Sequence, residues 1–565
     1  MVKKLLALTL CLAVAVPLVF ICGAESGDGL NIAVASDLHY CQPSETLERQ
    51  DGIDDEIYWY ANRRAAMEDE SGFIIDEFLR QCEENESDIV FISGDLVNDG
   101  RVLTEQHEDV AKKLDDFEKR SKKRVFVIDG NHDLGYNSAT DVEDFKRIYD
   151  HFGYDEALEI DSESCSYTAD LTEKYRLIAL DSCDHSKSTE DGLTLKRMAW
   201  FVRQAKKAKS DGKFIILMMH HNLLDHMPVQ RILSRNFIVR THRSYAETFA
   251  DMGVRVVFTG HEHCSDAAGY ISALGNRIYD FATTSLTMYP LQYRMVSFSD
   301  EKIDYSVKTV DKIDTDALTN TVGGYTEEQT ALMNEGLNSY ALGFLRAGVR
   351  YRLELQLSME KIGISEGKPF YKTVKTAVDE LKKILSMPLY GEDSVSSLAK
   401  GYNIDVPESG YKNGWELATD FVAAHYAGGE RSDLDSAETK ILLRIVELVL
   451  RDVPTNVGDE VYLKAANEII KGDVGAAEYL TKTATKLFGA ATPGEYFLLA
   501  VLSPVIYEFA YDSDGIDDNN GSIEGYAAEN SSAFQNLSEK YRTVFQKILY
   551  YIKLFFRYAF LGFVR

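Results

Sequence analysis

Five short motifs in the chain carry side chains whose types and order suit metal binding. The motifs are Asp37-Leu38-His39, Gly94-Asp95, Gly130-Asn131-His132-Asp133, His220-His221 and Gly260-His261-Glu262-His263. They supply carboxylates, imidazoles and one amide, a mixture of oxygen and nitrogen ligands that suits Mn, Fe and Zn. A carboxylate can bridge two ions, so the set is large enough to hold two metals around a shared aspartate. The identity of the metals is left open.

Each motif ends or closely follows an apolar run rich in Val and Ile, which is typical of a strand buried on both faces. We expect strands at 31–36, 88–93, 124–129, 176–181, 213–219, 255–259, 277–282 and 295–298. Helical patterns separate them, at 71–84, 105–120, 193–210 and 244–252. This alternation predicts an α/β architecture with a layered sheet flanked by helices. Ligands of such sheets bind beyond the carboxyl ends of the strands, so the motifs are expected to share one rim.

The motifs, in this order, resemble the signature of the calcineurin-like metallophosphoesterases over about residues 30 to 312. The layout of leader, phosphoesterase domain and long C-terminal extension looks like bacterial secreted members of that family. The resemblance implies two metal ions with Asp95 bridging them. The first ion would be held by Asp37, His39 and His263, and the second by Asn131, His220 and His261. Of the His220-His221 pair, the first histidine is the one that resembles the ligand.

The resemblance also implies the chemistry. Asn131 and His132 would bind the substrate phosphate, and His132 would protonate the leaving oxygen or stabilise charge on it. Asp133 is expected to orient the His132 imidazole. The reaction would be hydrolysis of a phosphate mono- or diester by in-line attack of a metal-bridging hydroxide. Two positions depart from the family pattern without removing a ligand: Asp129 precedes Gly130 and Asn222 follows the histidine pair, where proline is common.

A second function class stays open beside the enzyme. The chain could be an envelope adaptor whose metal site is vestigial and whose helical region binds a partner. Metal-dependent turnover would separate the two hypotheses. Within the enzyme hypothesis, the sequence does not choose between monoesters and diesters.

The second half of the chain changes in texture. The metallophosphoesterase domain is predicted to span 29–312, and the helical patterns at 326–505 predict an all-α domain of unknown role. Residues 506–535 are expected to form an acidic linker. The stretch 512–524 superficially resembles a calcium loop, but its glycine and glutamate do not fit the register of an EF-hand.

The charge of the chain limits its partners. The formal net charge of −29 favours solubility and argues against a nucleic-acid-binding surface. The five cysteines after position 24 show no paired spacing, so neither a disulfide framework nor a zinc knuckle is indicated.

The two ends of the sequence carry signals of location. Residues 1–24 join Lys3 and Lys4 to an apolar run, as in an export signal or an uncleaved anchor. Residues 536–565 predict a helix with a basic face opposite an aromatic face, which suits an anionic membrane surface. A helix docked on the α-domain is the alternative. The expected location is extracellular or associated with the cell envelope.

Overall fold

The structure is a computed structural model that describes part of the chain. The described residues are 29–42, 66–135, 138–186, 191–226, 230, 235–359, 365–367, 371–430, 432, 436–452, 512 and 515–525. The expected leader at 1–24 and the expected basic helix at 536–565 lie outside these residues. Among the residues described, no helix has both the length and the apolar character needed to span a bilayer.

One β-sheet has six strands in the order β13-β12-β11-β1-β2-β3. Its strands are β1 Leu30–Ala35, β2 Ile89–Ser93, β3 Arg124–Ile128, β11 Gln292–Phe298, β12 Lys302–Thr309 and β13 Asn520–Glu524. Strands β1, β2 and β3 are parallel, whereas β11, β12 and β13 pair antiparallel. Because the parallel strands share a direction, their carboxyl ends meet at one edge.

The other sheet has seven strands in the order β4-β5-β6-β7-β8-β10-β9. Its strands are β4 Glu159–Ile160, β5 Tyr167–Asp170, β6 Tyr175–Ala179, β7 Phe214–Met218, β8 Val254–Thr259, β9 Asp266–Ile271 and β10 Arg277–Ala282. The central strands β6, β7, β8 and β10 are parallel, and the marginal strands pair antiparallel.

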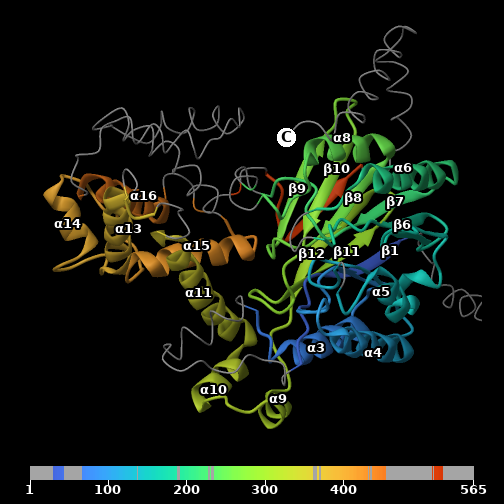
Figure 1. Cartoon of the computed structure of the whole chain (residues 1–565), viewed down its shortest axis with the longest axis horizontal. Coiled ribbons are helices and arrows are strands. Elements are labelled where there is room, and N and C mark those ends of the chain that lie inside the picture. The colour runs from blue at the N-terminus through green and yellow to red at the C-terminus, as the bar shows by residue number, and fades with distance from the viewer. Residues whose placement is uncertain are drawn as a thin grey trace, which may run out of the picture.

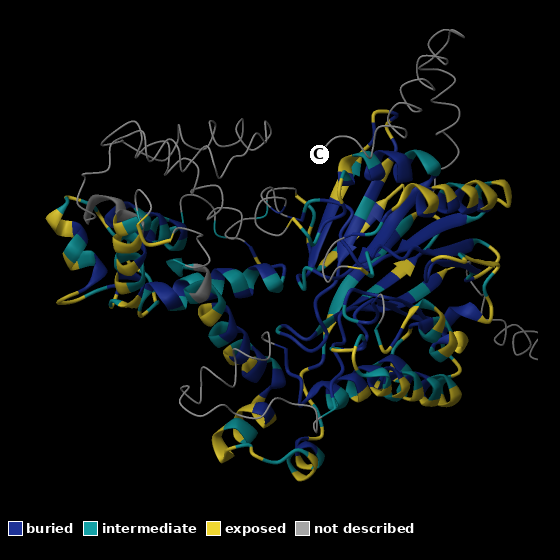
Figure 2. Cartoon of the chain, in the orientation of Figure 1, coloured by how far each residue is buried: buried dark blue, intermediate teal, exposed yellow. Residues whose placement is uncertain are grey.

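The two sheets pack face to face around one apolar core (Figure 1). The rings of Phe91 in β2 and Phe258 in β8 lie 6.1 Å apart across this core. Along β7 the side chains alternate, with Ile216 in the inter-sheet core and Leu217 in the core beneath the helices of the second sheet. This alternation follows from the two-residue period of a strand. It explains why central strands such as β2, β6, β7 and β8 read as continuous apolar runs and are buried along their whole length (Figure 2).

Helices cover the outer faces of the sheets. The helices of this half are α3 Ser71–Glu84, α4 Thr104–Ser121, α5 Val142–Ile148, α6 Leu195–Ser210 and α8 His242–Met252, with a π-helical turn η2 at Asp150–Tyr154. Phe201 of α6 packs against Phe249 of α8 over the second sheet, and Phe78 of α3 packs against Tyr293 of β11. The predicted α/β layered architecture is confirmed.

In its described part, the chain between β12 and β13 is helical, as predicted. The described helices there are α9 Thr315–Thr321, α10 Glu327–Glu335, α11 Leu337–Gln356, α13 Tyr371–Ser386, α14 Val395–Gly401, α15 Gly414–Tyr426 and α16 Ala437–Asp452. Helices α13 to α16 enclose their own apolar core, which includes Trp415, Phe421 and Leu448. The first part of the helical pattern predicted from residue 326 is two helices, α10 and α11, because the chain breaks between them at Gly336.

The expected acidic linker at 506–535 is not a linker in its described part. Asn520–Glu524 forms β13, an edge strand that pairs antiparallel with β12, and Ile523 packs into the inter-sheet core. The guanidinium of Arg294 on β11 donates to the Asp518 carbonyl at 2.6 Å. These partners lie more than two hundred residues away in the sequence, so the acidic composition of the segment could not indicate them.

Candidate metal centre

The strand ends bring the predicted ligands to one edge of the facing sheets. The residues just beyond the strands are Asp37 after β1, Asp95 after β2, Asn131 after β3, His220 after β7 and His261 after β8. The two sheets are joined there, since the His261 amide donates to Asp37 Oδ2 at 3.0 Å. His220 Nδ1 donates to the Ser93 carbonyl at the end of β2, 2.9 Å away. The predicted convergence of the motifs on one rim is therefore present.

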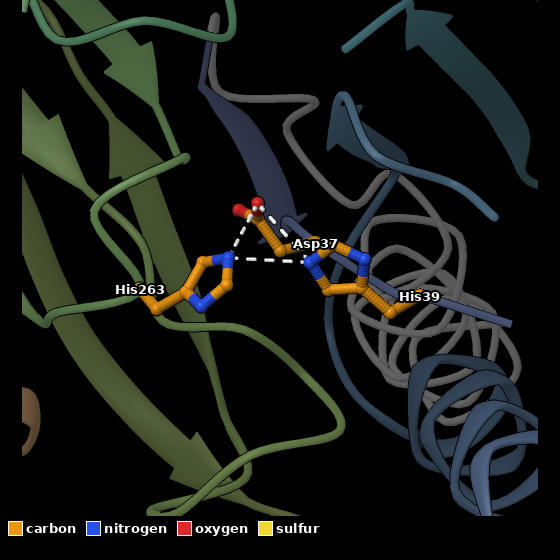
Figure 3. Close-up of side chains that lie close together, drawn as sticks. All are labelled: Asp37, His39 and His263. Atoms are coloured by element: carbon orange, nitrogen blue, oxygen red, sulfur yellow. Dashed lines mark hydrogen bonds and ion pairs between the residues drawn. The ribbon is translucent and has the colours of Figure 1, made fainter. Parts of the chain in front are cut away.

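Asp37, His39 and His263 form a first cluster of donor atoms (Figure 3). His263 Nε2 lies 3.1 Å from Asp37 Oδ1 and 3.2 Å from His39 Nε2. Asp37 Oδ2 accepts hydrogen bonds from Ser36 Oγ and from the His261 amide, whereas Asp37 Oδ1 is buried and accepts none. The cluster thus leaves one carboxylate oxygen and two ring nitrogens facing a common point.

Asp95, Asn131, His220 and His261 form a second cluster. His220 Nε2 lies 3.3 Å from Asp95 Oδ2, 3.2 Å from Asn131 Oδ1 and 3.1 Å from His261 Nδ1. Asp95 Oδ2 also lies 3.9 Å from Nε2 of His39, in the first cluster. One oxygen of Asp95 therefore faces both clusters, which is the position required of a bridging carboxylate.

This donor set fits two metal ions. Most of its members are almost fully buried, with exposed fractions between 0% for Asp37 and 4% for Asn131. His261 Nε2 is buried without a hydrogen-bond partner, and imidazole nitrogens face one another at hydrogen-bond distance. Buried polar atoms without partners are unfavourable unless a ligand satisfies them. Two carboxylates, four imidazoles and an amide oxygen provide enough donors for both ions.

The pKa values of the cluster show how charge is balanced there. Burial alone would raise the pKa of Asp95, but the nearby His220 and His132 hold it well below its usual range. Burial lowers the pKa of His39 to about 3, with His132 contributing. For His220, burial is outweighed by the Asp95 carboxylate, which raises the pKa to about 10. Metal ligands must be deprotonated, so an ion binding here would displace a proton from His220.

The backbone at these positions is held in an unusual conformation. Asp37, His39, Asp95, His261 and His263 all have positive φ, between 41° and 67°. This left-handed region is uncommon for residues other than glycine, although Asp and His are enriched among the exceptions. Each such residue is strained by roughly 1–3 kcal/mol and clusters of them occur at functional sites. This backbone conformation accompanies the convergence of the side chains at the strand ends.

His132 and Asp133 differ in part from the prediction. His132 Nδ1 donates to the Asn98 carbonyl at 2.7 Å, so a backbone group after β2 orients the ring. The Asp133 carboxylate instead accepts hydrogen bonds from the Gly130 and Val97 amides, at 2.7 and 3.1 Å. Burial raises the pKa of Asp133 well above its usual range. The predicted role of Asp133 as the group that orients His132 is therefore wrong, and its carboxylate fixes the turn that presents Asn131 and His132.

The match with a protein family agrees with this geometry. Residues 30–265 match the family model described as calcineurin-like phosphoesterase. The chain carries a calcineurin-like phosphoesterase domain. The matched residues end just after His263, so all five motifs of the phosphoesterase domain fall within them. No curated protein matches the sequence.

Solved structures that match about half of this chain include phosphatases. A dimetal phosphatase from Danio rerio is 9% identical, with a TM-score of 0.36, over 50% of this chain and 96% of that chain. Purple acid phosphatase PPD1 from yellow lupin (Lupinus luteus) is 10% identical, with a TM-score of 0.33, over 50% and 52%. A phosphopantetheinyl hydrolase from Mycobacterium tuberculosis is 13% identical, with a TM-score of 0.24, over 46% and 90%.

Two other groups in the phosphoesterase domain bear on the ligand assignment. His221 Nδ1 lies 3.0 Å from Ser182 Oγ, so this ring is engaged behind the site while His220 faces Asp95. Donor atoms of Asp129, Asp181 and Cys183 also lie within 4.8 Å of one another. Two cations already face that group, because His185 and Arg197 lie 3.0 and 3.1 Å from the Asp181 carboxylate. This second group is a buried ionic cluster behind the turn of residues 130–133.

The candidate metal centre opens into a cavity of about 430 Å³. Part of its wall consists of His39, Asp95, Asn131 and His132 from the phosphoesterase domain. Glu262, Phe237 and Met288 also line it, and two further residues, Arg352 and Tyr426, come from α11 and α15. The sequence prediction did not include these two residues, because nothing in the helical patterns indicated which helix lies beside the metal site.

Proposed function

We propose that the phosphoesterase domain hydrolyses a phosphate mono- or diester with two metal ions bound at the candidate metal centre. The single observation that carries this proposal is the position of Asp95 Oδ2 between two clusters of buried donor atoms. Asp37, His39 and His263 would hold one ion. Asn131, His220 and His261 would hold the other, and Asp95 would be shared between the two ions. The family match supports a metal-dependent phosphoesterase.

The metal ions would supply two things to the reaction. When bound, such a pair lowers the pKa of a coordinated water toward about 7 and neutralises charge on the phosphate oxygens. The chain itself supplies the geometry. The strained backbone at Asp37 and Asp95 fixes both carboxylates before any substrate arrives. Burial behind the sheets keeps bulk water away from all but the open side of the cavity.

His132 is the group proposed to handle the proton of the leaving oxygen. The Asn98 carbonyl can only accept a hydrogen bond, so Nδ1 of His132 carries a proton. Nε2 is then the ring nitrogen that gains or releases the second proton. His132 lines the cavity, and in its cationic form it can donate to a leaving oxygen or stabilise negative charge on it.

The test is hydrolysis of chromogenic phosphate mono- and diesters by the full chain loaded with manganese. Asp95→Asn should lose metal, measured by elemental analysis, and lose turnover with it. His132→Ala should keep its metal and lose roughly 10²–10⁴-fold in kcat, the usual contribution of a positioned acid or base. Asp76→Asn is the matched control, because this exposed carboxylate of α3 pairs with Lys113 of α4 at the protein surface.

The outcomes separate the enzyme from the adaptor. Turnover that disappears in Asp95→Asn and persists in Asp76→Asn supports the enzyme. If the wild-type chain binds two metal ions and hydrolyses no ester, the proposal fails. In that case a structural or vestigial metal site, with a partner bound by the helical region, becomes the better hypothesis.

A further inference from the structure

The helical region forms one wall of the catalytic cavity. Arg352 near the end of α11 and Tyr426 at the end of α15 line the same cavity as Asp95 and His132. At about 430 Å³ the cavity falls within the usual range of small-molecule sites, roughly 300–1,000 Å³. It has room for the group attached to a phosphate as well as for the phosphate. The wall that this group would meet includes α11 and α15.

The position of that wall is fixed by packing. An apolar cluster joins the loop before β11 to the two helices; its buried members are Ala66, Met288, Leu345, Val349 and Ala423. Arg346 of α11 donates to the Asp420 carboxylate of α15 at 2.6 Å, which ties the helices together. The Ser265 amide donates to the Tyr426 carbonyl at 3.0 Å, directly after the last metal motif. The end of α11 is therefore held beside the metal centre by apolar and polar contacts.

Arg352 differs from the other arginines of its helix. Arg346 pairs with Asp420, and Arg350 pairs with Glu354 and stacks on the Trp415 ring. The Arg352 guanidinium has no hydrogen-bond or ion-pair partner among the residues that the structure describes, and its side chain is half-buried at the cavity wall. The carboxylate of Glu262 lines the same cavity and accepts a hydrogen bond from Gln230 Nε2 at 3.1 Å.

An unpaired cation at the wall of a substrate cavity is suited to an anion. The scissile phosphate is accounted for by the metal ligands and His132, so Arg352 is available for a different negative group. A guanidinium binds carboxylates and phosphates with paired, charge-assisted hydrogen bonds. Phe237, Met288 and Tyr426 line the same cavity and can contact the carbon skeleton between the two anions.

We propose that Arg352 binds a second anionic group on the substrate, so that the preferred substrates are phosphate esters whose alcohol portion carries a carboxylate or another phosphate. This inference rests on the proposed phosphoesterase function. Arg352 is a specificity residue in this scheme and takes no part in the bond cleavage. The helical region is then part of the active site and selects the leaving group.

The experiment compares two esters that differ only in the second anion: phenyl phosphate and para-carboxyphenyl phosphate, each with the manganese-loaded full chain. Phosphate release gives kcat and KM. Arg352→Gln should raise KM for the carboxylated ester roughly 10- to 100-fold, the value of a charge-assisted hydrogen bond. KM for phenyl phosphate and both kcat values should stay within about twofold. Arg352→Lys, which keeps the charge, should restore part of the discrimination.

Arg350→Gln is the matched control, because Arg350 is on the same helix and lines a different cavity with Trp415 and Glu416. This substitution should leave kcat and KM unchanged for both esters. The same kinetics measured with phenylene bisphosphate show whether a phosphate is preferred to a carboxylate as the second anion. If Arg352→Gln raises KM for both monoesters equally, or for neither, the guanidinium does not recognise a second anion and the inference is overturned.

A binding measurement keeps this test separate from the proposed function. Phenylphosphonate and para-carboxyphenylphosphonate are stable analogues whose affinities can be measured by calorimetry without turnover. If no ester is hydrolysed but only the carboxylated phosphonate binds more weakly to Arg352→Gln, the anion site stands and the enzyme proposal fails. If turnover is present and both phosphonates bind equally well to wild type and variant, the enzyme proposal stands and the anion site fails.

Discussion

At the scale of single residues, the glycines of the motifs matter for the geometry of the candidate metal centre as much as the candidate ligands do. A Cβ atom placed on Gly130 would collide with the carboxylate and the amide of Asp95. A Cβ on Gly260 would collide with Asp37 and Ser36, and one on Gly94 would lie 2.5 Å from His220 Nδ1. The glycines of the motifs therefore let the strand ends approach closely enough for two clusters to share one aspartate.

Gly130→Ala should separate Asp95 from the turn that carries Asn131 and His132. We expect fewer than two bound metal ions by elemental analysis and a loss of turnover. Overpacking of this kind typically destabilises a protein by roughly 1–3 kcal/mol, measurable by chemical denaturation. Gly343→Ala is the matched control, since a Cβ there meets no atom within 4 Å. In the middle of α11 it should stabilise the helix by roughly 0.5–1 kcal/mol. Full metal content in Gly130→Ala would contradict the argument.

The sequence could indicate these candidate ligands because their types, order and positions after apolar runs are local features. Asp133 shows where local reasoning ended. Its neighbour in sequence is His132, but its hydrogen-bond partners are the amides of Gly130 and Val97. Arg352 shows the same limit, because a cation in an amphipathic helix is ordinarily a solvated residue. Only the packing of α11 beside the rim gives it a place in the site.

At the scale of elements, α4 supports the turn of residues 130–133 through His107, which the sequence did not indicate. His107 Nε2 donates to the Asp133 carbonyl at 2.7 Å, and Nδ1 accepts from the Tyr149 hydroxyl at 2.9 Å. The neutral imidazole satisfies both contacts. Burial lowers the pKa of His107 to about 4, against an ordinary value of 6.5. The helix thus holds the turn of residues 130–133 through a histidine that must stay uncharged.

This shift predicts a dependence of stability on pH. At pH values between the pKa of His107 in the folded chain and its pKa in the unfolded chain, His107 is protonated only in the unfolded chain. Acidification through this range therefore favours unfolding. From about pH 7 to about pH 5, His107 should remove roughly 2 kcal/mol of unfolding free energy. His107→Gln can donate and accept at the same places without titrating. Denaturation of wild type and variant at both pH values isolates the effect. An identical loss of stability in the two proteins would show that His107 is not the titrating group.

The elements were predictable to different degrees for physical reasons. The central parallel strands are buried on both faces, so their apolar runs are continuous and were found. Strand β13 (NGSIE) lies at a sheet edge with three exposed residues and a single buried one, Ile523, and its composition resembles a polar loop. Its register is set by β12 and by Tyr305, whose hydroxyl donates to the Asp517 carbonyl at 2.6 Å. No local pattern encodes a pairing across such a distance in sequence.

At the scale of the whole molecule, the chain leaves the phosphoesterase domain after β12, builds the helical region and returns as β13 (Figure 1). Asn519 lies where the loop after the last metal motif, the segment that leads into β13 and the end of α15 meet. Its Oδ1 accepts from Ser265 Oγ at 2.8 Å, beside the last metal motif. Its Nδ2 donates to the carbonyls of Ala427 and Gly428, at 2.8 and 3.1 Å, just after α15. One side chain thus joins the metal rim, the returning segment and the helix that carries Tyr426.

Asn519→Ala should loosen α15 from the metal rim without touching a ligand. Three hydrogen bonds are lost, which corresponds to roughly 2–4 kcal/mol of unfolding free energy. Amide hydrogen exchange should accelerate at 414–428 and stay unchanged in β1, β2 and β3, because the two regions have separate cores. Asn520→Ala, one residue further along the edge strand and exposed, is the matched control. If the helical region selects the leaving group, Asn519→Ala should also raise KM for para-carboxyphenyl phosphate more than for phenyl phosphate. Unchanged exchange in α15 would mean that the apolar cluster around Met288 holds the helices by itself, and that the returning segment does not position the cavity wall.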